Sequence, residues 1–171
     1  MHIRSCTLND IDTLVTVSVQ SYNEHYNYLW LDEGENYISK NFTHHQLEKE
    51  LHDNNSAFFI INDDTGPIGI IKINIDKTFE KYDASTAMEL ERLYLIKQAT
   101  GKGYGQAALN FSIDFARKKN KTILWLKTME NSAAAEFYKK QGFIIASHTE
   151  LNYPFIRREL RKMLILSKHL Y

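Results

Sequence analysis

The segment from Leu93 to Gln106 constrains the fold more than any other part of the chain. Apolar residues typical of a strand end at Ile96, three glycines follow at alternate positions, and an amphipathic helix begins directly after them. Glycine adopts positive φ easily and lets an anion approach the main chain closely. Free N–H groups of the first helical turn then point at that anion, and the helix dipole favours negative charge. Lys102, between two of the glycines, adds a positive charge. The segment therefore predicts a pyrophosphate-binding loop.

Hydrophobic periodicity and turn residues predict the elements around this loop. Before the loop we expect helices over about 10–27 and 43–53 and strands over 57–61, 68–75 and 88–96. After it we expect a helix to about residue 120, a strand over 122–126, a helix over 131–141 and strands over 143–149 and 162–168. Residues 26–42 are aromatic and acidic without a clear period. This order predicts an α/β fold with one mixed sheet and helices on both faces.

The composition indicates a single domain. The chain has 171 residues, of which 43% are apolar and 25% charged, so we expect one domain over residues 1–171. There is no run of about 18 apolar residues and no apolar leader at the N-terminus, so we expect a cytoplasmic protein without a membrane segment. Cys6 is the only cysteine, which excludes an internal disulfide and gives no cysteine cluster for a metal. We expect no metal site.

The two parts of the chain carry opposite charge, although the net charge is zero and gives no indication of nucleic-acid binding. Up to Arg92 there are 16 Asp/Glu and 7 Lys/Arg, and from Leu93 onward there are 5 and 14, which gives −9 and +9. One interpretation is a solvated surface of both signs. The other is a cationic side for an anionic cofactor and an anionic side for a cationic acceptor.

The glycine loop can be compared with three known kinds of phosphate-binding loop. A P-loop requires Gly-x4-Gly-Lys-Ser/Thr, which is absent. A dinucleotide fingerprint would use Gly103, Gly105 and Ala108, but the next strand does not end in an acidic residue and the motif lies late in the chain. The third pattern, Gln/Arg-x-x-Gly-x-Gly/Ala, is matched by Gln98, Gly101 and Gly103. A flexible turn that binds nothing is the simplest alternative.

A second motif lies downstream, where residues 131–143 read Asn-x-x-Ala-x-x-Phe-Tyr-x-x-x-Gly-Phe. On a helix, Asn131, Ala134 and Tyr138 would share one face, while Phe137 would point to the core. The alternative for Tyr138 is a half-buried aromatic residue without a chemical role. Together the two motifs resemble those of the GNAT superfamily of N-acetyltransferases, in which backbone amides of the first motif hold the pyrophosphate of acetyl-CoA.

This resemblance covers most of the chain and implies a fold and a cofactor. It implies the GNAT fold, a mostly antiparallel mixed sheet in which the strands over 88–96 and 122–126 splay apart and receive the pantetheine arm of acetyl-CoA. The N–H of Leu95 would donate to the thioester oxygen. The implied cofactor-binding residues are Leu93, Tyr94, Leu95, Gln98, Thr100, Gly101, Lys102, Gly103, Tyr104, Gly105, Gln106, Asn131, Ala134, Tyr138 and Lys140.

Direct transfer of the acetyl group to an amine requires a base and an acid. Glu89 and Glu91 share one face of a period-2 strand. Glu91 matches a position used as a water-relayed base in some amine acetyltransferases, so we expect Glu91 as the base and Glu89 as the second choice. The alternative is that both pair with cations. Tyr138 is the expected acid, because a phenol of pKa about 10 can protonate a thiolate whose parent thiol has a pKa of about 8.5 over a modest uphill gap.

The acceptor is implied by a finer resemblance. Within the superfamily the chain looks most like PaiA-like enzymes that acetylate spermidine and spermine, through residues 46–51, 89–94 and 137–143. The acidic first part, with its tyrosines and tryptophan, is suited to a polycation. We therefore expect a small amine acceptor, no nucleic-acid or membrane partner, and leave a homodimer open. The alternatives are an acetyltransferase acting on protein N-termini or lysines, and a non-catalytic acyl-CoA sensor.

Overall fold

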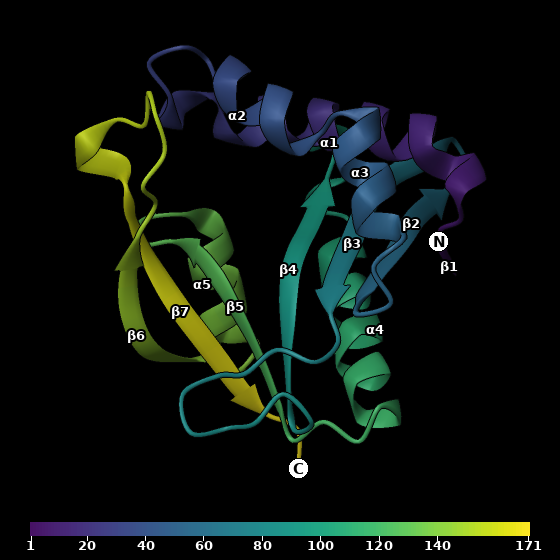
Figure 1. The fold of residues 1–171 in the computed structure, drawn as a ribbon, viewed down its shortest axis with the longest axis vertical. Coiled ribbons are helices and arrows are strands. Elements are labelled where there is room, and N and C mark those ends of the chain that lie inside the picture. The colour runs from purple at the N-terminus through teal and green to yellow at the C-terminus, as the bar shows by residue number, and fades with distance from the viewer.

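The computed structural model describes all residues 1–171 and contains one seven-stranded sheet with the order β1-β2-β3-β4-β5-β7-β6 (Figure 1). The strands are β1 (His2–Ser5), β2 (Ser56–Asp63), β3 (Gly66–Asn74), β4 (Ala87–Leu95), β5 (Ile123–Met129), β6 (Ile144–Glu150) and β7 (Lys162–His169). The α-helices are α1 (Ile11–Tyr26), α2 (Glu35–Asn41), α3 (His44–Leu51), α4 (Tyr104–Lys118) and α5 (Ala133–Lys140). None of the helices combines the length and the apolar character needed to cross a bilayer.

Helices cover the sheet on both faces. In Figure 1, α3 lies in front of β2 and β3, whereas α4 and α5 lie behind the sheet. Every strand pair is antiparallel except β4 with β5, which is parallel. The predicted mixed, mostly antiparallel sheet with helices on both faces is therefore confirmed.

The parallel pair at the centre of the sheet opens into a gap. β4 and β5 pair only at Ala87↔Ile123, Met88↔Leu124 and Glu89↔Trp125, and no pairing continues beyond Glu89. On the other side, β4 stays paired with β3 as far as Leu95. The expected splayed central pair is thus present, and the unpaired edge of β4 faces the gap.

The main core lies between the sheet and its helices. Residues 68–73 of β3 are buried without interruption, because helices cover both faces of this strand. Behind the sheet, the ring of Phe59 meets those of Phe111 and Phe115 on α4 edge-on, with centroids 4.8 and 5.3 Å apart. Such aromatic pairs contribute about 0.5–1.5 kcal/mol each beyond burial. They fix α4, and with it the glycine loop at its start.

The helix predicted over 131–141 begins later than expected. Ser132 is its N-cap, since its hydroxyl accepts the N–H of Ala135 at 3.1 Å, and α5 starts at Ala133. Asn131 therefore lies before the helix and is exposed. The expectation that Asn131 shares a helical face with Ala134 and Tyr138 is wrong for Asn131. The helix ends before Gly142, whose φ of 82° confirms the predicted left-handed residue.

Two short elements have no counterpart in the sequence-based expectation. β1 is a four-residue polar strand whose conformation comes from antiparallel pairing with β2. α2 lies in the aromatic segment 26–42 and follows Gly34, which has a φ of 89°. The carboxylate of Asp32 accepts the N–H groups of Gly34 and Asn36. This local turn initiates the helix without any hydrophobic period.

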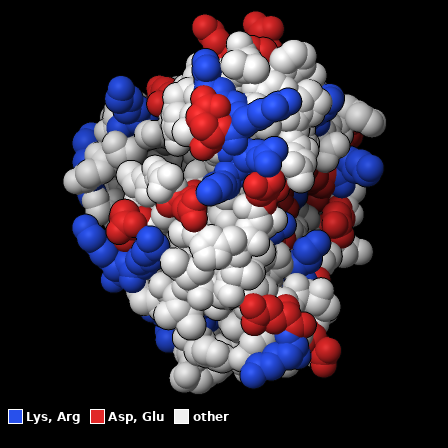
Figure 2. Space-filling view, turned by 90° about the vertical axis from the view of Figure 1, so that its left-hand side faces the viewer, with Lys and Arg blue, Asp and Glu red and all other residues white.

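The charge split of the sequence does not produce a single-sign surface on the face drawn in Figure 2, where basic and acidic side chains lie beside one another. Charges of the two parts also pair with each other. Lys121, from the cationic part, is buried and its Nζ lies 2.5 Å from Oδ1 of Asp76, from the acidic part.

Candidate functional site

The glycine loop presents an unobstructed anion-binding surface. Gly101 and Gly103 have φ values of 73° and 81°, and a Cβ added at either would meet no atom within 4 Å. The N–H of Ala107 makes the first backbone bond of α4, to the carbonyl of Gly103. The preceding N–H groups, those of residues 104–106, have no partner in the protein. The loop therefore offers free donors at a helix start, beside open space, as the sequence predicts.

A cavity of about 500 Å³, here named the loop cavity, lies between this loop, the end of β4 and α5. Ten of the predicted cofactor-binding residues line it. They are Leu93, Tyr94, Leu95, Thr100, Gly101, Gly103, Gly105, Gln106, Ala134 and Tyr138. The loop cavity thus joins both sequence motifs in one site.

A second cavity of about 400 Å³, here named the tyrosine cavity, lies in the gap between β4 and β5 and beneath α1. Its chemically distinctive lining consists of phenols, two carboxylates and one amide. These residues are Tyr22, Tyr26, Tyr37, Tyr94, Tyr138, Glu89, Glu91 and Asn74. A cavity with aromatic walls and carboxylates has the chemistry that holds an ammonium group.

The two cavities share part of their lining. Tyr26, Leu93, Tyr94, Ala134 and Tyr138 line both. A molecule in the loop cavity and another in the tyrosine cavity would therefore meet at the open edge of β4, next to Tyr138. This is the arrangement required for direct transfer of a group between two bound molecules.

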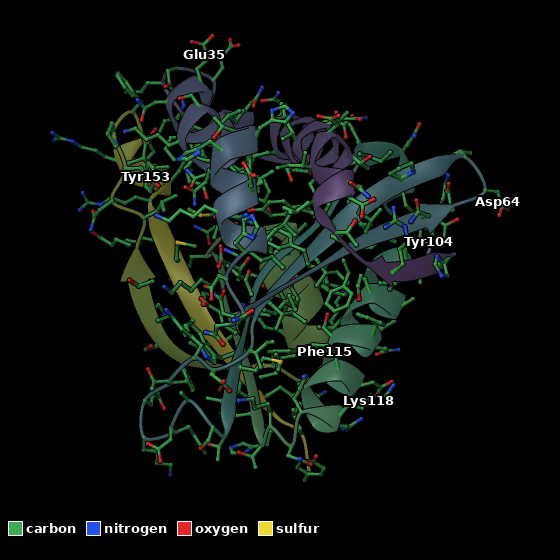
Figure 3. All side chains as sticks on the ribbon, turned by 45° about the vertical axis from the view of Figure 1, so that its right-hand side comes forward. Glu35, Asp64, Tyr104, Phe115, Lys118 and Tyr153 are labelled. Carbon is green, nitrogen blue, oxygen red and sulfur yellow. The ribbon has the colours of Figure 1, made fainter.

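Five of the predicted cofactor-binding residues do not line the loop cavity. Gln98, Lys102, Asn131 and Lys140 are exposed and lie outside its wall. Tyr104 contributes its free N–H, but its side chain lies near Asp63 and Asp64 at the β2–β3 hairpin (Figure 3). The sequence pattern predicts the position of the loop but does not give the direction of each side chain.

Sequence reasoning missed four residues of the loop cavity: His25, Tyr26, Ala133 and Phe137. The Nε2 of His25 lies 3.0 Å from the carbonyl oxygen of Leu95, so α1 holds the end of β4. Phe137 was expected in the core, yet its ring packs on the core and also forms part of the cavity wall. His25 carries no local signal, because its contact spans 70 positions in the chain.

The backbone of β4 supplies a donor at the gap. The N–H of Ile96 donates to the carbonyl of Ile68 on β3 at 2.9 Å. Successive N–H groups of a strand alternate between its two edges. The N–H of Leu95 therefore points away from β3, towards the gap and the loop cavity.

A buried ion network stands beside the tyrosine cavity. Nζ of Lys72 lies 3.0 Å from Glu50 and 2.8 Å from Glu91, and the guanidinium of Arg92 lies 2.8 Å from Glu50 and 3.1 Å from Glu91. Two cations thus balance two carboxylates. Burial disfavours the charge of Glu50, but Arg92 and Lys72 outweigh it and hold the pKa of Glu50 below its usual value. Arg92 also lies over the ring of Phe42.

Glu89 differs from its neighbour Glu91 in having no cationic partner. It is only 6% exposed, and its one side-chain hydrogen bond comes from Nδ2 of Asn74 at 2.7 Å. The same nitrogen donates to Glu91, also at 2.7 Å. Both carboxylates thus lie on one face of β4, as predicted, but only Glu91 is neutralised. A buried carboxylate without a cation favours a cationic ligand.

Two phenols at the junction, those of Tyr26 and Tyr138, are half-buried and buried respectively and keep their protons. Burial raises the pKa of Tyr26 to about 12 and also raises the pKa of Tyr138. The hydroxyl of Tyr138 has no hydrogen-bond partner in the protein, although this residue lines both cavities. Tyr138 is therefore an unpaired proton donor where the two cavities meet.

Comparison with known proteins identifies a family and several relatives of this chain. A model described as the acetyltransferase (GNAT) family matches residues 20–143. An uncharacterized N-acetyltransferase of Lactobacillus delbrueckii subsp. lactis is 27% identical over 107 residues, which are 62% of this chain and 62% of that protein. The chain spans about three fifths of the length of the curated relatives it matches.

Two solved structures share the fold. The PaiA N-acetyltransferase of Thermoplasma acidophilum in complex with coenzyme A has a TM-score of 0.75 at 22% identity, over 98% of both chains. A variant of the spermidine N-acetyltransferase SpeG of Vibrio cholerae has a TM-score of 0.71 at 17% identity, over 99% of this chain and 93% of that one. At these identities the likeness concerns the fold alone.

Proposed function

Because the chain belongs to the acetyltransferase (GNAT) family, we propose that it transfers the acetyl group of acetyl-CoA directly to the nitrogen of a primary amine. The observation that carries this proposal is the meeting of the loop cavity and the tyrosine cavity at Tyr138, across the open edge of β4. One cavity suits an anionic cofactor and the other suits an amine. Their contact allows both to be bound at once.

The loop cavity fits the cofactor. The free N–H groups of residues 104–106 would hold the pyrophosphate, and the open space over Gly101 and Gly103 would admit it. The N–H of Leu95 would stabilise the negative charge that develops on the thioester oxygen during attack. A single donor of this kind is worth on the order of 3–4 kcal/mol in the transition state. Bound acetyl-CoA supplies the activated acyl group.

Glu89, rather than Glu91, is our choice for the residue that receives the acceptor. Glu91 is already paired with Lys72 and Arg92, so its charge is not free for a cationic acceptor. Glu89 lies in the wall of the tyrosine cavity, buried and without a cation. It would bind the ammonium form of the amine and take its proton, directly or through water. This reverses the order expected from the sequence.

Tyr138 is our choice for the acid. After the amine nitrogen has bonded to the acyl carbon and the carbon–sulfur bond breaks, the leaving thiolate requires a proton. The buried phenol of Tyr138 is unpaired and keeps its proton because burial raises its pKa. The same burial would raise the proton affinity of a thiolate beside it, so the transfer stays feasible. The position of Tyr138 in both cavities favours catalysis over a sensor that only binds acyl-CoA.

For the acceptor we propose a polyamine such as spermidine or spermine. Tyr22, Tyr26, Tyr37 and Tyr94 provide aromatic faces around the uncompensated charge of Glu89. Such faces attract ammonium groups, by about 2 kcal/mol where water is excluded. The likeness in fold to a spermidine N-acetyltransferase is in accord with this choice.

A second acceptor class is favoured by one observation. Lys77 and Lys127 also line the tyrosine cavity, are exposed, and form no salt bridge. Unpaired lysines at the edge of a cavity attract anions. An amine that also carries an acidic group, such as an amino acid or a peptide, would place its ammonium at Glu89 and its anionic group near these lysines.

The test is an amine panel with acetyl-CoA in which released thiol is measured. The panel contains spermidine, spermine, a monoamine, amino acids and a short peptide. We expect turnover with the polyamines and a loss of about a hundredfold or more in kcat for Glu89→Gln, as for removal of a general base. Glu91→Gln should lower kcat less than Glu89→Gln does. The absence of turnover with every amine, together with calorimetric binding of acetyl-CoA, would leave the sensor as the correct reading.

A further inference from the structure

Asn74 connects the two carboxylates of the tyrosine cavity. It is the last residue of β3 and lies opposite Glu89 in the register of β3 with β4. Its Nδ2 donates to Oε2 of Glu89 and to Oε2 of Glu91, in both cases at 2.7 Å. An amide nitrogen carries two protons. Both are therefore used, one for each carboxylate.

A β-bulge makes this arrangement possible. Lys72 pairs with Arg92 and Ile73 pairs with Leu90, so Glu91 is an extra residue on β4. In a regular strand Glu91 and Arg92 would point to opposite faces of the sheet. The bulge instead lets both join the ion network, while Glu91 still reaches Asn74.

The choice of an amide at this position has an electrostatic consequence. Two carboxylates that share one donor repel each other, and Glu89 has no other side-chain partner to hold it in place. A lysine or arginine at position 74 would also hold Glu89 but would cancel its charge. Asparagine is neutral, so it fixes the carboxylate and leaves its full charge for a cation that enters the cavity.

We propose that Asn74 is a positioning residue, which links Glu89 to the ion network and holds its carboxylate, still uncompensated, at the wall of the tyrosine cavity for the ammonium group of the acceptor. This inference rests on the proposed function. It assigns Asn74 no proton transfer. Its effect is on the binding and orientation of the amine through Glu89.

A double-mutant cycle tests the assignment. Asn74→Leu keeps the approximate volume of the side chain but removes both donors, and Asn74→Lys supplies a cation. We expect each to lower kcat/KM for the amine about ten- to hundredfold, as for loss of hydrogen bonds to a charged group. Acetyl-CoA affinity should change less than about twofold, because Asn74 does not line the loop cavity. In the Glu89→Gln background, Asn74→Leu should have little further effect.

Several outcomes would overturn the assignment. Equal losses from Asn74→Leu in the wild-type and Glu89→Gln backgrounds would mean that Asn74 acts independently of Glu89. An undiminished amine kcat/KM for Asn74→Lys would mean that the free charge is not needed. Asn54→Leu, an exposed change in the turn before β2, is the matched control and should leave all constants unchanged.

Two further measurements separate the possible failures. If Asn74→Leu does not fold, as judged by its melting temperature, the cycle is run with Asn74→Ala, which also removes both donors but adds no bulk. Calorimetric binding of spermidine gives a readout that does not need turnover, and Asn74→Lys should weaken it at least tenfold. A wild-type protein that binds spermidine without acetylating it refutes the proposed function but not the role of Asn74, whereas equal spermidine binding by wild type and Asn74→Lys refutes that role.

Discussion

Tyr138 is the residue on which the proposed chemistry can be tested with the smallest change. Tyr138→Phe removes one hydroxyl that has no partner in the protein, so packing should be preserved. We expect kcat to fall by about a hundredfold, in the range for loss of a general acid. The dissociation constant of acetyl-CoA, measured by calorimetry, should stay within about twofold, because no cofactor-holding group other than the phenol is lost.

The pH dependence gives a second measure of the same residue. Burial raises the pKa of Tyr138, so the neutral phenol is favoured and the proton is retained well above the ordinary value of about 10. Ionisation of Tyr138 should therefore not reduce kcat at any pH up to about 10. Equal kcat for wild type and Tyr138→Phe across the whole range would remove Tyr138 from the mechanism.

At the scale of single residues, the sequence predicts which residues lie near the site better than it predicts where their side chains point. Tyr138 and Ala134 lie four positions apart on α5, and helical spacing alone brings both to the cavity wall. Asn131 fails because the N-cap, Ser132, lies between it and the helix. The pairing of Glu91 with Lys72, 19 positions away, is not visible in any sequence pattern, so the sequence does not distinguish the surroundings of Glu91 from those of Glu89.

Among the elements, the ion network couples α3 to β3 and β4, and its removal should cost stability. Glu50→Gln leaves buried Lys72 and Arg92 with Glu91 as their one remaining carboxylate. We expect a loss of about 3 kcal/mol at pH 7, the lower end for breaking a buried pair, because Glu91 still compensates in part. Urea unfolding at pH 7 measures this loss.

The sign of the pH effect follows from the lowered pKa of Glu50. A depressed pKa stabilises the folded protein above the unfolded value of about 4.3, and this contribution is lost as the pH falls through the folded pKa. The difference between wild type and Glu50→Gln should therefore shrink as the pH falls below about 4.3. A difference that grows towards acid pH would contradict this account.

The glycine loop is the second element that can be tested by itself. Gly103→Ala places a side chain at a φ of 81°, and relief of that strain would turn the free N–H groups away from the anion. The loss of one charge-assisted hydrogen bond is expected to raise the acetyl-CoA Kd about tenfold or more. Gly66→Ala is the control, since its φ is 124° and it lies in the β2–β3 turn. It should destabilise the protein without changing that Kd.

A helix or strand can be predicted from the sequence when its own residues specify it, and cannot when contacts with distant residues form it. α4 and the strands with strong apolar patterns are specified locally, and they occur where they are expected. β1 exists through pairing with β2, and α2 through the turn at Asp32, so neither has a hydrophobic period to detect. The bulge at Glu91 is likewise set by the ladder between β3 and β4.

For the molecule as a whole, the site is a product of long-range contacts. The fold class and the splayed strand pair follow from the order of elements and from the family resemblance. The walls of the two cavities do not, because α1 contributes Tyr26 to both and contributes His25, which contacts Leu95, to the loop cavity. Neither residue stands in a motif, and only the folded chain brings them to the site.

The electrostatic field at the cavity mouth gives a prediction that discriminates between acceptors. Lys77 is exposed and lines the tyrosine cavity, whereas Lys118 is exposed near the far end of α4 (Figure 3). Lys77→Glu and Lys118→Glu alter the net charge equally but at different distances from the acceptor. For a polyamine, Lys77→Glu should lower KM about two- to fivefold at low salt, because exposed charges act weakly through water. The effect should fade as salt is added, and Lys118→Glu should leave KM unchanged. Steady-state kinetics with spermidine measures both.

For an acceptor with an acidic group, Lys77→Glu should instead raise KM, so the sign of the change identifies the class of molecule that the tyrosine cavity binds.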